Sequence, residues 1–220
     1  MRLILIRHGQ TPSNVRGLLD TAAPGPGLTE LGWEQAAAVP EVLAGEQVDV
    51  VFASNLIRTQ QTAHPLVTQR ELPVVIRPGI REIEAGHLEM QGDPQSVESY
   101  MVTIGQWWHD LEVRMPGGES GTEVFSRFDA VVNEAHRGGA DTAVFFSHGA
   151  MIRAWTGGRA GNISPDFVAA TPVRNTGVVV LEGAPNDGWE VLAWEGEAIG
   201  GELVDAPGRS GPTGEAEVEQ

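Results

Sequence analysis

The sequence predicts an α/β fold: a three-layer α/β/α sandwich with a mostly parallel central sheet of about six strands. Apolar runs of four to six residues alternate along the chain with longer segments that have helical periodicity. The runs are continuously apolar, which indicates strands buried on both faces between two layers of helices. A Gly/Pro/Asn-rich turn alone joins the last two runs, which predicts an antiparallel hairpin at the edge of the sheet.

Each element follows from its local pattern. Thr29 has the character of a helix N-cap, and apolar positions continue from there to residue 43. A second helix is expected to begin after Ser54 or Asn55, a third at Ser120 or Thr122, and a fourth at residue 150. The predicted strands, in chain order, are residues 3–6, 48–53, 72–76, 142–146, 178–181 and 189–194.

The domain organisation is predicted from changes in composition. Residues 1–195 are expected to form one domain, with a small helical cap inserted at about 86–118, where periodicity is weak. Trp107 and Trp108 lie in the middle of this insertion and are expected to pack within it. Residues 196–220 are rich in Gly, Pro and Glu and are expected to form an acidic tail.

Composition excludes several classes of protein. The chain has no Cys, which excludes disulfides and cysteine nucleophiles, and its 14 basic residues are all Arg, which excludes a Walker-type phosphate loop. A net charge of −16 argues against nucleic acid or an anionic membrane as a partner. No apolar run approaches the length of a bilayer span and no signal peptide is recognisable, so a cytoplasmic location is expected.

Two predicted strands end in the same way. Arg7-His8-Gly9 follows the first strand, and Ser147-His148-Gly149 follows the fourth. In an alternating β/α chain, these ends meet at one edge of the sheet, where sites of open α/β folds lie. Arg58 stands in the first turn of a helix that follows another strand, so it is expected to face the same edge. Two Arg and two His around one pocket favour a dianionic, tetrahedral ligand.

These residues belong to a longer series of motifs that resembles the histidine phosphatase superfamily, in its phosphoglycerate mutase-like branch. The series extends in order over about residues 2–181. It comprises Arg-His-Gly-Gln-Thr at 7–11, Asn14, Ser-x-Leu-x-Arg-x-x-x-Thr at 54–62, Arg81-Glu82, Gly-Gly-Glu-Ser at 117–120 and Ser-His-Gly at 147–149.

The resemblance implies a role for each matching residue. His8 corresponds to the nucleophile that forms a phosphohistidine, and Glu82 to the general acid and base. Glu82 is preferred to Glu84 and Glu89 because its spacing to Gly86 matches the family's Glu-x-x-x-Gly loop. The implied phosphate-binding residues are Arg7, Asn14, Arg58, His148 and Gly149, and neither metal nor cofactor is required because Arg and His supply the positive charge.

The predicted function is hydrolysis of a small phosphorylated metabolite by a metal-independent phosphomonoesterase. One alternative is a phosphoglycerate mutase, which uses the same phosphohistidine. The family's mutases have a Glu-Ser-x-Trp-Asn run after Arg-His-Gly, whereas this chain has Gln10-Thr11-Pro12-Ser13-Asn14. A second alternative is a non-catalytic phosphate-binding module. The resemblance also suggests a homodimer formed through a sheet edge.

Overall fold

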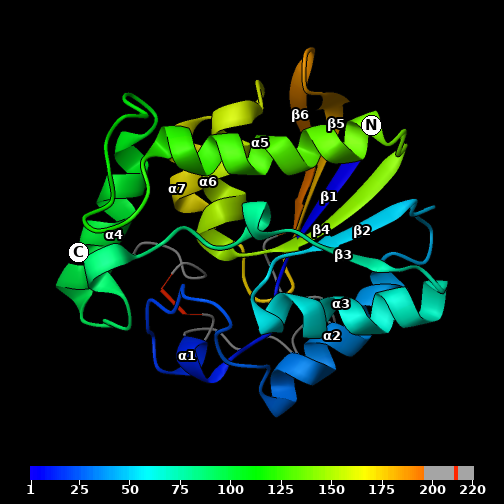
Figure 1. Ribbon diagram of the computed structural model, residues 1–220, viewed down its shortest axis with the longest axis horizontal. Helices are drawn as coiled ribbons and strands as arrows, with labels where there is room; N and C mark the ends of the chain where they lie inside the picture. Colours follow the sequence, from blue (N-terminus) through cyan, green and yellow to red (C-terminus); the bar gives the residue numbers. More distant parts are fainter. Residues whose placement is uncertain (196–210, 213–220) are drawn as a thin grey trace.

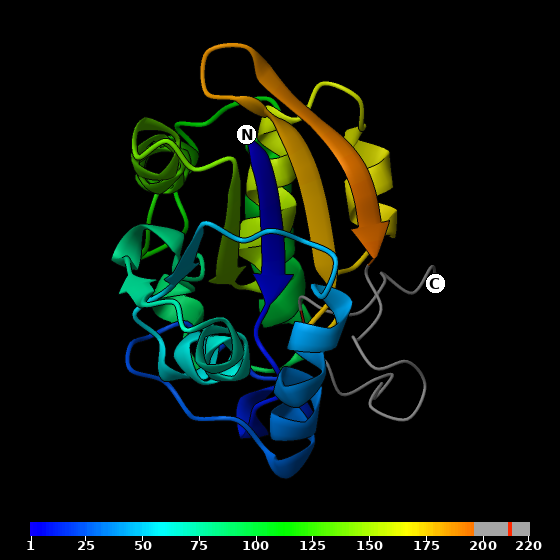
Figure 2. The same cartoon turned by 90° about the vertical axis from the view of Figure 1, so that its right-hand side faces the viewer.

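The computed structural model describes residues 1–195 and 211–212. Six strands form one sheet in the order β3-β2-β4-β1-β5-β6. The first four of these run parallel, and β5 and β6 form the predicted antiparallel hairpin at one edge (Figure 2). The strands are β1 Arg2–Arg7, β2 Val50–Ala53, β3 Val74–Ile76, β4 Thr142–Ser147, β5 Val178–Ala184 and β6 Gly188–Glu195.

Helices cover both faces of the sheet, which confirms the predicted α/β sandwich (Figure 1). Helices α2 (Glu30–Val42) and α3 (Ile57–Arg70) lie on one face, and α5 (Gly121–Arg137) and α6 (Gly149–Arg159) on the other. Side chains alternate along β1 between these two layers. Ile4 and Ile6 join the apolar cluster of α2 and α3, whereas Leu3 and Leu5 join the cluster of α5 and α6.

The predicted insertion contains one α-helix, α4 (Pro94–Gln106), and a 3₁₀ helix at Gly86–Leu88, and α4 packs against the same apolar cluster as α5. Tyr100, Ile104 and Trp107 are buried in that cluster, and the indole nitrogen of Trp107 donates to the carbonyl of Val113. Trp107 therefore packs within the protein, as expected. The division into domain, cap and tail stays a prediction, and the predicted tail lies outside the described residues except for 211–212.

Two short helices, α1 (Pro12–Val15) and α7 (Pro165–Ala170), were not predicted from the sequence. Both are too short to have a helical repeat of apolar residues. Helix α1 follows β1 almost directly and carries Asn14. Within the described residues, no helix has the length and apolar character that crossing a bilayer would need.

Helix starts agree with the sequence at α2 and α5 and differ at α3. Thr29 caps α2, and Ser120 caps α5. The N-cap of α3 is Leu56, which makes no side-chain cap, instead of Ser54 or Asn55. The hydroxyl of Ser54 points elsewhere, to His148 and Thr59. Strands β2 and β3 each begin two residues later than predicted, at Val50 and Val74.

Candidate active site

The pairing of β1 with β4 brings the two predicted site histidines together. These strands are parallel neighbours, and their last residues, Arg7 and Ser147, are register partners. His8 and His148 each follow their strand by one residue, so their rings lie side by side with centroids 5.1 Å apart and planes tilted by 59°. Strand β2 pairs with β4 on its other side, and α3, which follows β2, brings Arg58 to the same sheet edge.

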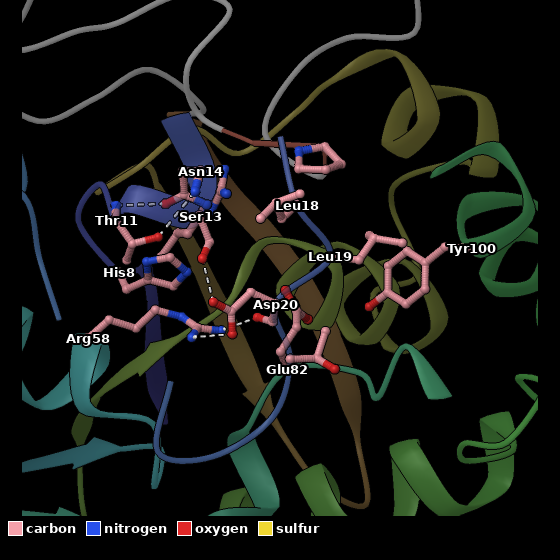
Figure 3. Close-up of a pocket in the computed structure, with 13 residues that line it drawn as sticks. His8, Thr11, Ser13, Asn14, Leu18, Leu19, Asp20, Arg58, Glu82 and Tyr100 are labelled. Carbon is pink, nitrogen blue, oxygen red and sulfur yellow. Dashed lines mark hydrogen bonds and ion pairs between the residues drawn. The ribbon is translucent and has the colours of Figure 1, made fainter. Parts of the chain in front are cut away.

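A small cavity opens at this edge (Figure 3). His148 is fully buried and is not on its lining, although its ring lies beside that of His8. The other predicted site residues on the lining are Arg7, His8, Asn14, Arg58 and Glu82. The remaining lining residues, which the sequence did not single out, are Thr11, Ser13, Leu18, Leu19, Asp20, Thr21, Tyr100 and Pro212.

His8 is held as a neutral imidazole of defined orientation. Its Nδ1 lies 2.8 Å from the carbonyl oxygen of Gly9. A carbonyl only accepts hydrogen bonds, so Nδ1 carries the proton and Nε2 keeps a free lone pair. Burial lowers the pKa of His8 well below its usual value, and the charges of Arg58 and Arg7 lower it further. At neutral pH, His8 therefore presents an unprotonated nitrogen beside two guanidinium groups.

Arg58 is buried with little direct charge compensation. One terminal nitrogen donates to the backbone carbonyl of Asp20 at 2.9 Å. The other lies 3.9 Å from the Asp20 carboxylate and makes no hydrogen bond to any described residue. Ser13 of α1 donates a hydrogen bond to that carboxylate (Figure 3). Unfilled donors on a buried cation are ready to bind an anion.

Glu82 sits between the cavity and the start of α6. Its Oε1 accepts hydrogen bonds from the backbone of Ile83 at 3.0 Å and Met151 at 2.9 Å, and its Oε2 accepts from Ala150 at 3.3 Å. Burial raises the pKa of this carboxyl, although these amides and the charges of Arg58 and Arg7 oppose the rise. A buried carboxyl with a raised pKa suits proton transfer near neutral pH.

Residues 3–196 match the family model of the histidine phosphatase superfamily (branch 1). The chain belongs to this superfamily. The match covers the strands, the site and the helices between them, and it agrees with the resemblance that the sequence motifs carry. The protein is thus a phosphatase of the histidine phosphatase family.

Three relatives illustrate the range of proteins that this phosphatase resembles. Glucosyl-3-phosphoglycerate phosphatase of Mycobacterium tuberculosis is 30% identical over 214 residues, which are 88% of this chain and 91% of that protein. Adenosylcobalamin/alpha-ribazole phosphatase of Escherichia coli K12 is 36% identical over 138 residues, 61% of this chain and 68% of that protein. The PE-PGRS family protein PE_PGRS11 of M. tuberculosis is 36% identical over 213 residues, and the chain spans only 36% of its length.

Solved structures give the same assignment. The mycobacterial glucosyl-3-phosphoglycerate phosphatase in complex with VO3 superposes with a TM-score of 0.74 at 27% identity. That match covers 88% of this chain and 98% of the other. A structure described as mycobacterial hydrolase 1 has the same TM-score at 28% identity and covers 88% of this chain and 97% of its own.

In this histidine phosphatase, the segment before β5 fixes the end of β1. Arg7 donates to the carbonyl of Val173 at 2.8 Å, and Asn175 donates to the carbonyl of His8 at 3.0 Å. The backbone amide of Thr176 donates to the carbonyls of Arg7 and His8. Thr176 has φ of +60°, a left-handed conformation that costs energy for a β-branched residue. Sequence reasoning missed this segment because its contacts are long-range and it has no motif.

Arg127 of α5 holds the loop that carries Glu82. Its terminal nitrogens donate to the carbonyls of Gly79, Arg81 and Glu82 at 2.7–3.0 Å. It also makes two hydrogen bonds to the carboxylate of Glu119, at 2.8 and 3.0 Å. In the sequence, Glu119 appears only within the Gly-Gly-Glu-Ser motif, because its pairing with Arg127 of α5 becomes apparent only when the structure is known.

Asn14 and the far end of the cavity complete the site. The side-chain oxygen of Asn14 accepts from the backbone of Thr11 at 3.0 Å and from Asn175 at 3.2 Å, so Asn14 caps α1 as well as lining the cavity. Gly149 is buried at the first position of α6. Leu18, Leu19, Tyr100 and Pro212 contribute the less polar part of the lining, and Leu19 and Tyr100 lie on the side away from Arg58 (Figure 3).

The histidines outside this site, and the second tryptophan of the insertion, lie elsewhere. Trp108 is absent from the cavity lining and borders a second cavity with Phe125 and Arg159. His64, His87, His109 and His136 are exposed. Among the described residues, no group of three or more His, Asp or Glu is arranged to hold a metal ion.

Proposed function

We propose that the chain hydrolyses a small phosphorylated metabolite through a phosphohistidine formed on His8. The observation that carries this proposal is the state of His8: neutral, with Nδ1 donating to Gly9 and Nε2 unprotonated, on the lining of a cavity shared with Arg7 and Arg58. A nucleophile needs a free lone pair, and a phosphoryl group needs compensating positive charge. Both requirements meet at one edge of the sheet.

In the first step, Nε2 of His8 attacks phosphorus, an N–P bond forms and the P–O bond to the leaving group breaks. Arg7 and Arg58 bind the equatorial oxygens and stabilise the charge that gathers on them. Arg58 has a buried terminal nitrogen that makes no hydrogen bond within the described part of the chain, and this nitrogen can bind such an oxygen. Asn14 offers its amide nitrogen, because its oxygen is already used by Thr11 and Asn175. Gly149, the first residue of α6, is not on the cavity lining, and we assign it no contact with the phosphoryl group.

Glu82 serves as the general acid and base. In its protonated form, it gives a proton to the leaving oxygen; as a carboxylate, it then takes a proton from the water that attacks the phosphohistidine. Burial raises its pKa, which keeps the protonated form populated at higher pH than for an ordinary Glu. The backbone amides of Ala150 and Met151 stabilise the carboxylate between the two steps.

The substrate class follows from the relatives and from the cavity. The relatives are named for phosphatase activity on glucosyl-3-phosphoglycerate and on alpha-ribazole compounds, each a phosphate ester with an organic body. Leu18, Leu19, Tyr100 and Pro212 offer such a body a less polar surface beyond the guanidinium groups. We therefore propose a phosphate monoester with a partly apolar alcohol as substrate.

The test is a screen for phosphate release from phosphorylated metabolites, including these two esters, together with a search for acid-labile phosphoenzyme after rapid quenching. The proposal expects phosphate release and a labelled enzyme that disappears in His8→Ala, with His64→Ala on the exposed face of α3 as a matched control. Isomerisation of phosphoglycerate without phosphate release would instead indicate a mutase. Phosphate release by His8→Ala at the normal rate would exclude the mechanism.

A further inference from the structure

Ser54, which follows β2, lies beside His148 in a buried chain of hydrogen-bonding groups. Its hydroxyl oxygen is 2.8 Å from Nε2 of His148 and 3.0 Å from the hydroxyl of Thr59 on α3. It also accepts a hydrogen bond from the backbone amide of Leu56 at 3.2 Å. Ser54, Thr59 and His148 are all fully buried, and none of them lines the cavity.

The proton of Thr59 has a defined place in this chain. The Thr59 hydroxyl lies 2.8 Å from the carbonyl of Leu56 and 3.2 Å from the carbonyl of Ser54. Carbonyl oxygens only accept, so Thr59 must be the donor in both contacts. Its oxygen then remains available to accept a hydrogen bond from Ser54.

Counting donors and acceptors in the same way determines which partner the Ser54 hydroxyl donates to, and this in turn determines the tautomer of His148. If Ser54 donates to Thr59, its two lone pairs accept from Leu56 and from an N–H at Nε2 of His148, and every donor of these groups has an acceptor. If Ser54 donates to Nε2 instead, no proton is left between the two hydroxyl oxygens at 3.0 Å. The second arrangement also leaves a buried N–H without a partner at Nδ1, which costs more than an unfilled lone pair.

Nδ1 of His148 is buried and has no hydrogen-bond partner among the residues that the structure describes. Burial lowers the pKa of His148 well below its usual value, and Arg58, His8, Arg7 and Arg127 lower it further. The ring is therefore neutral in the free protein. With Nε2 engaged by Ser54, Nδ1 is the nitrogen of His148 left for a ligand bound at His8, which lines the cavity and whose ring centroid is 5.1 Å from that of His148.

We propose that Ser54 and Thr59 are positioning residues that hold His148 as the Nε2–H tautomer, so that Nδ1 accepts the acidic proton of a monoanionic phosphoryl group. This inference rests on the proposed function, since it assumes that the phosphoryl group binds in this pocket. In the step, the P–O–H bond breaks and an Nδ1–H bond forms. The phosphoryl group gains one negative charge and His148 becomes an imidazolium, whose Nε2–H stays bonded to Ser54.

The first test uses the unmodified protein labelled with ¹⁵N-histidine. Nitrogen chemical shifts distinguish the two neutral tautomers, and His148→Asn and His8→Asn variants serve only to assign the signals. The expected result is an unusual pair: His8 protonated on Nδ1, where it bonds to Gly9, and His148 protonated on Nε2. Adding inorganic phosphate should convert His148 to the doubly protonated form. A free His148 that carries its proton on Nδ1 would overturn the proposal.

The second test compares Thr59→Val with Thr59→Ser, because Val keeps the shape of Thr without its hydroxyl and Ser keeps the hydroxyl. Calorimetric titration with inorganic phosphate at pH 8, in two buffers of different ionisation heat, counts the protons taken up. The wild type and Thr59→Ser should take up about one proton, since free phosphate is dianionic there. Thr59→Val should take up less and bind about tenfold more weakly.

A merely structural role for Thr59 would weaken phosphate binding without changing proton uptake or the tautomer of His148, and would overturn the proposal. Equal phosphate affinity and equal proton uptake in Thr59→Val and the wild type would also overturn the proposal. Neither test needs turnover. A protein that binds phosphate with proton uptake but hydrolyses no ester would therefore refute the proposed function while leaving the assigned tautomer in place.

Discussion

The imidazole rings of His8 and His148 lie with their centroids 5.1 Å apart and both are neutral in the free protein. Two imidazolium ions could not be buried at this distance beside Arg7 and Arg58. The guanidinium groups therefore supply the permanent positive charge of the site, and the imidazoles are free for nucleophilic attack and for proton transfer. This separation of tasks leads to distinct expectations for each residue.

Replacing His8 by Asn should abolish turnover, because Asn lacks a nucleophilic nitrogen. We expect the rate of phosphate release to fall by at least about a thousandfold. The thermal midpoint should stay within a few degrees, because His8 lines an existing cavity that the smaller Asn side chain only enlarges. Steady-state assays and thermal denaturation measure the two quantities, and His136→Asn on the exposed surface of α5 is the control.

Replacing Arg58 by Gln should move the acid limb of activity to higher pH. Burial, and then the charges of Arg58 and Arg7, hold the pKa of His8 below its usual value of 6.5. Because the neutral form attacks, wild-type kcat/KM should fall only at a pH below that value. Removing one positive charge makes the imidazolium less unfavourable, so the pKa rises and protonation of His8 inactivates the variant earlier as pH decreases.

The pH profile of kcat/KM checks this expectation, with Arg70→Gln at the opposite end of α3 as the matched control. Arg58→Gln will also bind substrate more weakly at every pH, so the position of the limb, and not the absolute rate, is decisive. An acid limb that stays in place or moves to lower pH would contradict the assignment of His8 as the titrating group.

The sequence was sufficient to predict which residues meet at the edge of the sheet. It was not sufficient to predict the residues that surround and support them. Apolar runs and strand-end motifs placed Arg7, His8 and His148 together, because parallel neighbours such as β1 and β4 end at the same edge. The helix cap at Thr29 was also readable, since its hydroxyl bonds to an amide three residues away. A helix cap is a local signal, and the meeting of strand ends follows from the parallel arrangement of an alternating β/α chain.

Other parts of the site depend on contacts that no local pattern encodes. Asp20 lies in a loop without periodicity, and its proximity to Arg58 follows from how that loop folds over α3. Arg127 looks like an exposed residue of an amphipathic helix until the loop of Glu82 is placed against it. Ser54 has the sequence character of a helix cap, yet its hydroxyl forms a hydrogen bond with His148, a residue distant in sequence.

Replacing Arg127 by Gln should loosen the loop that carries Glu82. The variant loses hydrogen bonds to three backbone carbonyls and leaves the buried carboxylate of Glu119 with Arg81 as its remaining partner. We expect kcat to fall about tenfold and the thermal midpoint to fall by about 5 °C. Arg114→Gln is the matched control, because Arg114 pairs with Glu123 at the start of the same helix but both side chains are about half exposed.

Arg114→Gln should leave kcat unchanged and shift the thermal midpoint little. If both variants lost stability equally, the ion pair of Arg127 would have no special part in supporting the site. A loss of stability in Arg127→Gln without any loss of kcat would show that the loop keeps Glu82 in place by other contacts.

Replacing Asp20 by Asn should strengthen binding of inorganic phosphate. The Asp20 carboxylate lies 3.9 Å from Arg58 in the free protein and repels an incoming anion. The backbone carbonyl of Asp20, which also binds Arg58, is unaffected by the substitution. We expect phosphate affinity to rise about fivefold at low salt, with a smaller gain at high salt. Calorimetry at two salt concentrations measures this, and Asp187→Asn in the exposed β5–β6 turn is the control.

Weaker binding by Asp20→Asn would mean that the carboxylate serves mainly to orient Arg58 and does not compete with the ligand. In that case, the decrease should not depend on salt, because lost orientation is not a long-range charge effect. The two outcomes therefore differ both in sign and in salt dependence.

Replacing Leu18 by Asn should change selectivity between substrates. Leu18 is half-buried in the less polar part of the cavity lining, together with Leu19, Tyr100 and Pro212. A substrate with an apolar alcohol, such as p-nitrophenyl phosphate, would lose contact with it, so we expect KM to rise about fivefold. A small polar ester such as phosphoserine reaches only the guanidinium end, and its KM should change by less than about twofold. The ratio of the two KM values is the measured quantity.

The control is Leu192→Asn, which replaces an exposed leucine on β6 and should leave the ratio unchanged. An equal rise of both KM values in Leu18→Asn would show instead that Leu18 shapes the phosphoryl pocket itself.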